Sequence, residues 1–184
     1  EYHSLILNLS FILHMHQSYY KNLLTQENQV TWVRLHGIKD YRDMVEILEK
    51  YPKIHQTFNL VPSLVEQVED YNQGKVKDKF LDLSRKNAAS LTADEKAFIL
   101  NNFYSINKER VIAMHPRYYE LHFKKQAQKE YTTQDYLDLQ VWFNLAWIDP
   151  YFREDLPEFR HAMQKGRFFS EEEKRAILAR SLQI

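Results

Sequence analysis

The interpretation of the chain depends on the segment Leu5-Ile6-Leu7-Asn8-Leu9-Ser10-Phe11-Ile12-Leu13 and on the residues that follow it directly, His14-Met15-His16-Gln17. Its first part is mostly apolar, and a short run of this kind with β-branched and aromatic members is typical of a buried strand. The polar residues come where that strand is expected to end. In extended backbone, residues two apart point to the same side. We therefore expect the side chains of His14 and His16 to converge on one point.

The next stretch predicts a loop, a second extended segment and a helix. Residues 18–29 are polar and predict the loop. Residues 31–36 predict extended backbone, with Val33 and Leu35 on one side and Trp32, Arg34 and His36 on the other. Asp40 then caps a predicted helix that Pro52 ends. The apolar side chains of that helix recur at helical spacing, at Tyr41, Met44, Val45 and Leu48.

A second strand and a second helix follow. Residues 53–60 (Lys-Ile-His-Gln-Thr-Phe-Asn-Leu) predict the strand, and Pro62 opens a helix that ends near Gly74. The order strand, helix, strand, helix is typical of a parallel βα architecture. We therefore assign the chain to the α/β class, with two parallel strands near its start.

The rest of the chain predicts helices. Thr92 with Glu95, and Ser170 with Glu173, have the spacing of a capping box, in which side chain and backbone cap each other at a helix start. Two further helices are expected next to prolines, at residues 118–125 and 134–147.

The aromatic side chains of this helical region are expected in its core. Trp142, Phe143 and Trp147 lie within the predicted helix 134–147, where large rings fill an interior. Asp149, which precedes Pro150, is interpreted as part of a helix stop rather than as a catalytic acid.

The two halves of the chain therefore differ in kind. Residues 1–74 hold the predicted βαβα units, and residues 75–184 form a helical insertion region of the same domain. A closed parallel barrel usually needs about 250 residues, and two parallel strands alone leave unpaired edges. We expect the remaining strands to lie beyond Ile184, so that the fold is incomplete as it stands.

The composition excludes several classes of function. The 184 residues include no Cys, which excludes disulfides, thiolate nucleophiles, Cys-ligated zinc and iron–sulfur clusters. The glycines Gly37, Gly74 and Gly166 are too far apart to form a phosphate-binding loop. Lys and Arg (25) balance Asp and Glu (25), so no broad basic face for nucleic acid is expected. Neither a secretory signal nor a membrane-spanning run is visible, and we expect a cytoplasmic protein.

His14 and His16 admit three interpretations. A His-x-His pair on a strand can ligate zinc, although a metal site normally needs a third protein ligand. The pair can instead donate hydrogen bonds to the hydroxyl groups of a ligand, or it can be a purely structural pair. The carboxyl end of a parallel strand is where βα enzymes hold their active sites, and all three interpretations stay open.

Further polar and aromatic side chains follow. Trp32 can stack on the apolar face of a sugar, while Arg34 and His36 can bind its hydroxyl groups. For Trp32 taken alone, simple packing onto the fold is the preferred interpretation. Asn59 ends the second predicted strand, so its amide either joins His14 or caps the following helix, and capping is the preferred interpretation.

Three blocks of sequence stand out together. They are His14-Met15-His16-Gln17, Thr31-Trp32-Val33-Arg34-Leu35-His36-Gly37-Ile38-Lys39-Asp40-Tyr41, and His55-Gln56-Thr57-Phe58-Asn59-Leu60-Val61-Pro62-Ser63-Leu64. With residues 116–121 and 142–147 they closely resemble the N-terminal region of glycoside hydrolase family 57, over almost the whole chain. That family groups α-amylases, amylopullulanases, 4-α-glucanotransferases and branching enzymes.

The resemblance implies the N-terminal part of a (β/α)7 barrel that hydrolyses or transfers α-glucosidic bonds with retention of configuration. Its substrates would be starch, glycogen or maltooligosaccharides, and no cofactor or metal is expected. Ser18 stands where the family motif has Pro, which frees the backbone at the loop entry. The candidate substrate-binding residues are His14, His16, Gln17, Trp32, Arg34, His36 and Asn59.

The catalytic carboxyl groups are not among the matched residues. A retaining glycosidase needs a nucleophile and an acid/base about 5–5.5 Å apart. In the family these are a Glu and an Asp in motifs downstream of the matched region, and no position of this sequence matches either motif. We expect them beyond Ile184, in the missing C-terminal part of the barrel, and we expect this polypeptide alone to be inactive.

Two other functions remain open on the sequence alone. One is a metal-dependent hydrolase of the deacetylase kind, with His14 and His16 as ligands. The other is a non-catalytic helical interaction protein.

Overall fold

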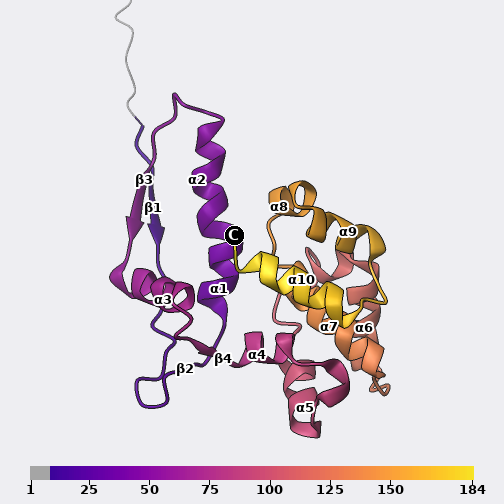
Figure 1. Cartoon of the computed structure of the whole chain (residues 1–184). Helices are drawn as coiled ribbons and strands as arrows, with labels where there is room; N and C mark the ends of the chain where they lie inside the picture. Colours follow the sequence, from indigo (N-terminus) through magenta and orange to yellow (C-terminus); the bar gives the residue numbers. More distant parts are fainter. Residues whose placement is uncertain (1–8) are drawn as a thin grey trace, which may run out of the picture.

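The computed structural model describes residues 9–184, which form two visibly different parts (Figure 1). Residues 9–78, here called the βα part, contain short strands with helices beside them. Residues 79–184, here called the helical part, are built from helices joined by short turns. In Figure 1 the long helix that includes α1 and α2 stands between the strands and the helical part.

The βα part has the predicted parallel order. Its strands are β1 (Ile12–Met15), β2 (Glu27–Asn28), β3 (Thr57–Leu60) and β4 (Lys77–Asp78). Its helical elements are α1 (Trp32–His36), the π-helical segment η1 (Gly37–Tyr41), α2 (Arg42–Glu49) and α3 (Pro62–Asn72). β1 pairs with β3 and β2 pairs with β4, both in parallel. The α/β prediction is confirmed at this level, and residues 9–184 form no closed barrel.

β1 is shorter than the predicted strand and lies further along the chain. Of the predicted residues 5–13, residues 5–8 lie outside the described residues, and pairing with β3 starts only at Ile12. The strand continues through His14 and Met15, so these residues belong to it rather than follow it.

The position of β1 depends on its partner strand. The prediction of a strand over residues 53–60 is wrong for its first half, because Ile54 N–H bonds to the carbonyl oxygen of Tyr51 (2.9 Å) and closes a turn. β3 therefore begins at Thr57, whose N–H bonds to the carbonyl oxygen of Phe11 (3.2 Å). The predicted start of α3 at a proline is confirmed.

Residues 31–36 are helical, and the prediction of extended backbone there is wrong. α1 buries the consecutive residues Val33, Arg34 and Leu35, because the helix is covered from more than one side. It continues through η1 into α2, so Asp40 lies inside a helix and does not cap one. The predicted helix end shortly before Pro52 is confirmed.

The helical part matches the sequence prediction closely. Both predicted capping boxes are present, at the starts of α5 and α10, and α7 has a third formed by Thr132 and Asp135. Asp149 is more than a helix stop, because its carboxylate accepts the N–H of Tyr151 (2.8 Å) and caps the next helix. The helices are α4 (Lys79–Arg85), α5 (Ala93–Asn102), α6 (Pro116–Gln126), α7 (Thr133–Leu145), α8 (Pro150–Asp155), α9 (Pro157–Lys165) and α10 (Glu171–Ser181), with the 3-10 turns η2 (Ala88–Ser90) and η3 (Ile112–Met114).

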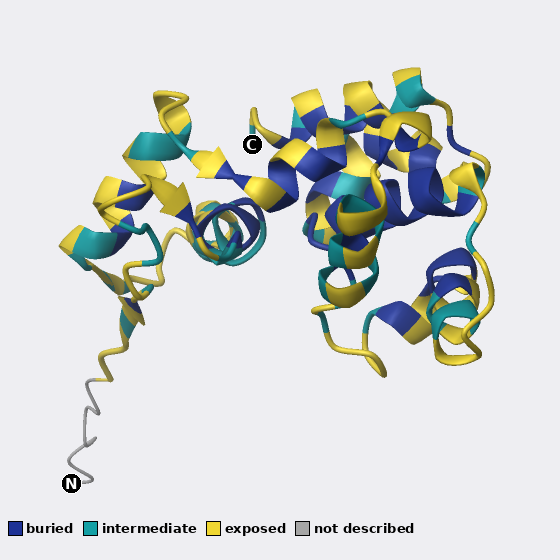
Figure 2. Ribbon diagram, turned by 90° about the horizontal axis from the view of Figure 1, so that it is seen from below, coloured by how far each residue is buried: buried dark blue, intermediate teal, exposed yellow. Residues whose placement is uncertain are grey.

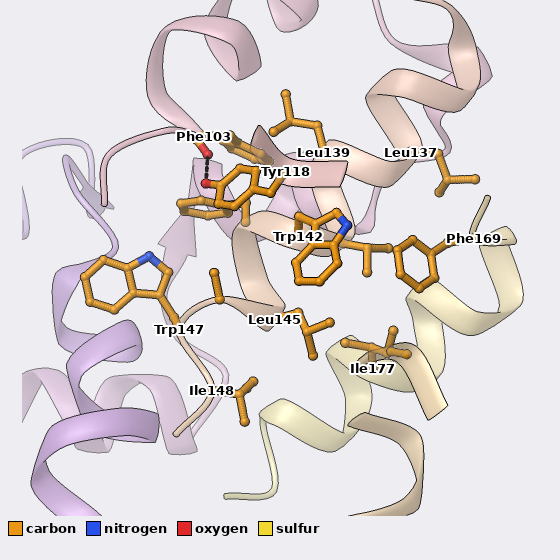
Figure 3. Close-up of a cluster of buried hydrophobic side chains, with 14 of the residues drawn as sticks. Phe103, Tyr118, Leu137, Leu139, Trp142, Leu145, Trp147, Ile148, Phe169 and Ile177 are labelled. Atoms are coloured by element: carbon orange, nitrogen blue, oxygen red, sulfur yellow. Dashed lines mark hydrogen bonds between the residues drawn. The ribbon is translucent and has the colours of Figure 1, made fainter. Parts of the chain in front are cut away.

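A large aromatic core holds the helical part together (Figure 3). The rings of Phe103 and Phe143 stack with centroids 4.2 Å apart, and the hydroxyl of Tyr118 donates to the carbonyl oxygen of Phe103. Trp142 is 2% exposed at the centre of this cluster. The prediction that Trp142, Phe143 and Trp147 are core residues is confirmed.

The βα part buries much less (Figure 2). Its core consists of Met15, Val33 and Leu64, with partly buried rings around them. Ile12 on β1 is 68% exposed and Leu60 on β3 is 55% exposed. Parallel sheets are normally covered on both faces, so this two-stranded sheet is unusually open.

A buried polar network joins the two parts. Arg34 on α1 donates from Nη1 to Oδ1 of Asn144 on α7 (3.1 Å), and its Nε lies 3.6 Å from Oδ2 of Asp78. Asp78 also accepts the hydroxyl of Thr31 (2.6 Å) and caps α4. These contacts fix α1 between the strands and the helical part.

Candidate functional site

The imidazoles of His14 and His16 emerge side by side at the carboxyl end of β1. Their rings are stacked with centroids 5.7 Å apart and an interplanar angle of 13°. Both residues are exposed, while Met15 between them is buried against Leu64 and Val33. The alternation of a strand produces this arrangement, so the expected convergence of the two rings is observed.

Asn59 joins this pair from the neighbouring strand. It stands opposite His14 in the β1–β3 register, and its amide nitrogen donates to Nδ1 of His14 (3.0 Å). The preferred interpretation that Asn59 caps α3 is wrong, since the residue before that helix is Val61 and no side chain caps it. Because Nδ1 accepts a hydrogen bond, the ring proton of neutral His14 lies on Nε2 and is available to a ligand.

Gln17 holds the loop that leaves the site. Its amide nitrogen donates to the hydroxyl of Tyr41 (2.7 Å), and its amide oxygen accepts the hydroxyl of Tyr20 (2.9 Å). Tyr41 in turn donates to the carbonyl oxygen of His16 (3.3 Å), and burial raises the pKa of its phenol. Both ends of the Gln17 amide are thus occupied, and Tyr41 fixes the backbone beside the two imidazoles.

A row of rings continues from Tyr41 to the helical part. The ring of His36 lies 6.4 Å from that of Tyr41 and 5.3 Å from that of Trp147, measured between centroids. Nδ1 of His36 contacts the carboxylate of Asp40. Trp32 packs on Trp147 with centroids 5.7 Å apart, which is the packing role considered for it. The row connects the site to the junction between the two parts.

Arg34 lies away from the imidazole pair. Its guanidinium is 4% exposed, and its hydrogen bonds go to Asn144 and to the hydroxyl of Thr31 (3.2 Å). The structure therefore brings together His14, His16 and Asn59, with Gln17 behind them. Trp32 and Arg34 face the junction instead. The ring of His36 lies between the two sets of residues, near Trp147 on one side and near Tyr41, which contacts His16, on the other.

Sequence reasoning did not identify Tyr41 as part of the site. It was interpreted as an apolar helix position, whereas its hydroxyl is the polar end that a partly buried tyrosine normally pairs. No sequence motif around Tyr41 indicates its contact with the backbone of His16.

A comparison with protein families gives the site its chemical context. The model of glycosyl hydrolase family 57 matches residues 10–180. The chain belongs to glycosyl hydrolase family 57. This confirms the resemblance drawn from the sequence blocks. No curated protein and no solved structure gives a significant match.

Family 57 members are glycoside hydrolases, so the carboxyl groups near the site matter. Among residues 9–184, Asp40 contacts Nδ1 of His36, and Glu66 accepts the hydroxyl of Tyr19 (2.7 Å). Neither contacts His14 or His16 in this part of the chain. No group of three or more His, Cys, Asp or Glu residues in the described chain could hold a metal ion. Over the same residues, no helix has the length and apolar character needed to cross a bilayer.

Proposed function

We propose that this family 57 chain is the N-terminal part of the (β/α)7 catalytic barrel of a cytoplasmic, retaining glycosidase or glucanotransferase acting on α-glucans. Residues 1–74 supply the first βα units and residues 75–184 a helical insertion. Family membership supports the reaction class. The observation that carries the site is the exposed, stacked pair of imidazoles at the carboxyl end of a parallel strand.

His14, His16 and Asn59 bind the glucose unit in this proposal. The Nε2–H of His14 donates to a sugar hydroxyl, and the free amide oxygen of Asn59 accepts one. Neutral imidazoles and amides suit a neutral polyol because each hydroxyl both donates and accepts hydrogen bonds. Gln17 acts as a positioning residue, since its own amide is occupied by tyrosine hydroxyls.

Trp32, Arg34 and His36 are positioning residues as well. Trp32 and Arg34 hold α1 against the helical part through Trp147 and Asn144. His36 lies between Trp147 and Tyr41, and so links that junction to the backbone of the sugar-binding residues. Their influence on sugar binding is therefore indirect.

The open sheet supports the proposal that further barrel strands complete the fold. Ile12 and Leu60 are large apolar residues of a parallel sheet, yet both are mostly exposed. Completion of the barrel would cover them, with further strands around its inner face and helices on its outer face, and would bring carboxyl groups to the same end of the sheet. We place the nucleophilic Glu and the acid/base Asp of the family on that additional part, beyond Ile184.

Binding of maltoheptaose to the 184-residue chain tests the sugar site. In nuclear magnetic resonance titrations we expect shifts at His14, His16 and Asn59, and about fivefold weaker binding in His14→Ala or His16→Ala, the effect of one lost hydrogen bond. His55→Ala is the matched control, because His55 is exposed on the loop before β3. Equal affinity of all the variants would contradict the assignment.

Two further measurements separate the alternatives. The chain alone should not release reducing sugar ends from maltooligosaccharides, and turnover above that of His16→Ala would contradict the placement of the catalytic carboxyl groups. Stoichiometric zinc that disappears in His14→Ala would favour a metal-dependent hydrolase instead.

A further inference from the structure

A second polar cavity lies at the same end of the βα part as the imidazole pair. It has a volume of about 560 Å³ and lies between residues 22–29 and the start of α4. We call it the loop cavity. In Figure 1 the strands that border it, β2 and β4, lie beyond the carboxyl ends of β1 and β3.

The wall formed by residues 22–29 is held by its own hydrogen bonds. The side-chain oxygen of Asn22 accepts the N–H groups of Leu24 (2.9 Å) and Thr25 (3.3 Å). The backbone N–H of Asn22 donates to the carbonyl oxygen of Glu27 (2.9 Å). Gln26 adopts a left-handed conformation with φ 59° that closes the turn. The cavity wall is therefore built before any ligand arrives.

Four charged side chains line the loop cavity and do not pair with one another. They are the carboxylates of Glu27 and Asp82 and the ammonium groups of Lys77 and Lys79. Over residues 9–184 none of the four takes part in a side-chain hydrogen bond or an ion pair. Lys79 lies 4.2 Å from the ring centroid of Phe98, which also lines the cavity. All four side chains are exposed to solvent, and partial desolvation with the nearby carboxylate of Asp78 raises the pKa of Asp82.

This lining matches a neutral polyhydroxylated ligand. Two negative and two positive groups leave no net charge to select an anion or a cation. A sugar hydroxyl needs an acceptor and a donor at once, and the carboxylates, the ammonium groups and the amide of Gln29 supply both.

Two hydrogen bonds lead from the loop cavity to Gln17, the residue that follows His16. The N–H of Gln29 donates to the carbonyl oxygen of Tyr20 (3.1 Å), and the hydroxyl of Tyr20 donates to Gln17 (2.9 Å). Lys21 also bonds Asp70 of α3 (2.7 Å), which ties the loop to that helix. One ordered loop thus carries the cavity at one end and begins at the proposed sugar site at the other.

We propose that the loop cavity is a second carbohydrate subsite, which binds glucose units of the same α-glucan chain that His14 and His16 engage. The inference rests on the proposed function for the identity of the sugar. Its structural basis is separate, namely the unpaired, charge-balanced lining of a preformed cavity.

A titration of the isotope-labelled 184-residue chain with maltoheptaose tests this subsite. We expect amide shifts at Glu27, Gln29 and Asp82 in addition to those at the imidazole pair. Asp82→Asn and Gln29→Ala should each weaken the response of the cavity residues about fivefold, with the shifts at His14 retained. Asp155→Asn is the matched control, because Asp155 is exposed at the far end of α8.

The outcomes distinguish the two proposals. Shifts confined to His14, His16 and Asn59 would overturn the second subsite and leave the proposed function intact. Shifts confined to the loop cavity would support a binding cavity and contradict the proposed function. The titration of the unaltered chain decides the matter even where a variant does not fold.

Discussion

Trp142 in α7 is 2% exposed, and Ile12 in β1 is 68% exposed, although both are large apolar residues in regular secondary structure. The helical part surrounds its aromatic side chains with several capped helices. The separate core of the βα part consists of Met15, Val33 and Leu64, and this part carries the proposed sugar-binding residues.

The difference separates the part that provides stability from the part that holds the site. The helical part buries most of its apolar side chains in one large contiguous core. The βα part leaves its strands open and is attached through the junction at Arg34 and Asp78 and through Leu35 and Ile38, which pack into the helical core. Its polar end is therefore held in place mainly by neighbouring structure.

The largest expected effect comes from removing the centre of the helical core. Trp142→Ala should lower the free energy of unfolding by about 3–5 kcal/mol, the range for large-to-small changes at buried aromatic residues. The variant also leaves the carbonyl oxygen of Gly166 without the indole donor it has now (2.9 Å). Urea denaturation followed by circular dichroism measures this loss.

The corresponding change in the βα part sharpens the contrast. Ile12→Ala removes a mostly exposed side chain and should cost less than about 0.5 kcal/mol. A cost of several kcal/mol would mean that β1 is buried in solution, and the contrast between the parts would not hold.

The next largest effect is expected at the junction. Asp78→Asn removes the negative charge beside the buried Arg34, and breaking a buried pair in this way costs about 3 kcal/mol. We expect the βα part to unfold before the helical part in this variant, which amide hydrogen exchange can resolve residue by residue. Asp155→Asn, at an exposed site, serves as the control. Unchanged exchange in residues 9–78 would show that the junction does not hold the two parts together.

An effect of pH is expected in the helical part. Burial, with the nearby guanidinium of Arg153, lowers the pKa of His115 to about 4 from an ordinary value near 6.5. The unfolded chain therefore binds this proton more tightly, and stability falls as the pH drops from about 6.5 to about 4.5, by about 2 kcal/mol. Parallel pH series for the wild type and His115→Gln isolate this contribution, because all other groups titrate in both proteins. Identical pH dependence of the two proteins would contradict it.

The smallest effect is expected at a helix cap. The hydroxyl of Ser170 accepts the N–H of Glu173 (3.1 Å) at the start of α10. Ser170→Ala should cost about 1 kcal/mol, measured as a shift of the denaturation midpoint. Ser10→Ala, at an exposed position before β1, should leave the midpoint unchanged. Equal shifts of the denaturation midpoint in Ser170→Ala and Ser10→Ala would show that helix capping does not distinguish the helical part from the βα part.

The helical part was predictable because its signals are local. A capping box such as that of Thr92 and Glu95 involves residues three apart, and its geometry needs no distant partner. α1 was mispredicted because its burial depends on distant residues. Arg34 is buried beside partners far along the chain, Asp78 and Asn144.

The candidate site likewise combines contacts that the local sequence predicts with contacts that depend on distant residues. The pairing of His14 with His16 follows from the alternation of a strand and was predictable from their spacing. The contact of Asn59 with His14 depends on the register of two strands, which the start of β3 after the turn at Tyr51 decides. The row of rings through His36 required the position of Trp147, which no local pattern supplies.

The π-helical segment Gly37–Tyr41 has a consequence for how this chain tolerates change. A wider turn accommodates one additional residue, and each residue of a regular helix advances by about 100°. The segment therefore sets the rotational phase between His36, which faces Trp147, and Tyr41, which reaches the backbone of His16. Deleting one residue of this segment would rotate Tyr41 away from His36 and from the backbone of His16. Many substitutions, which keep the number of residues, would leave the rotational phase unchanged.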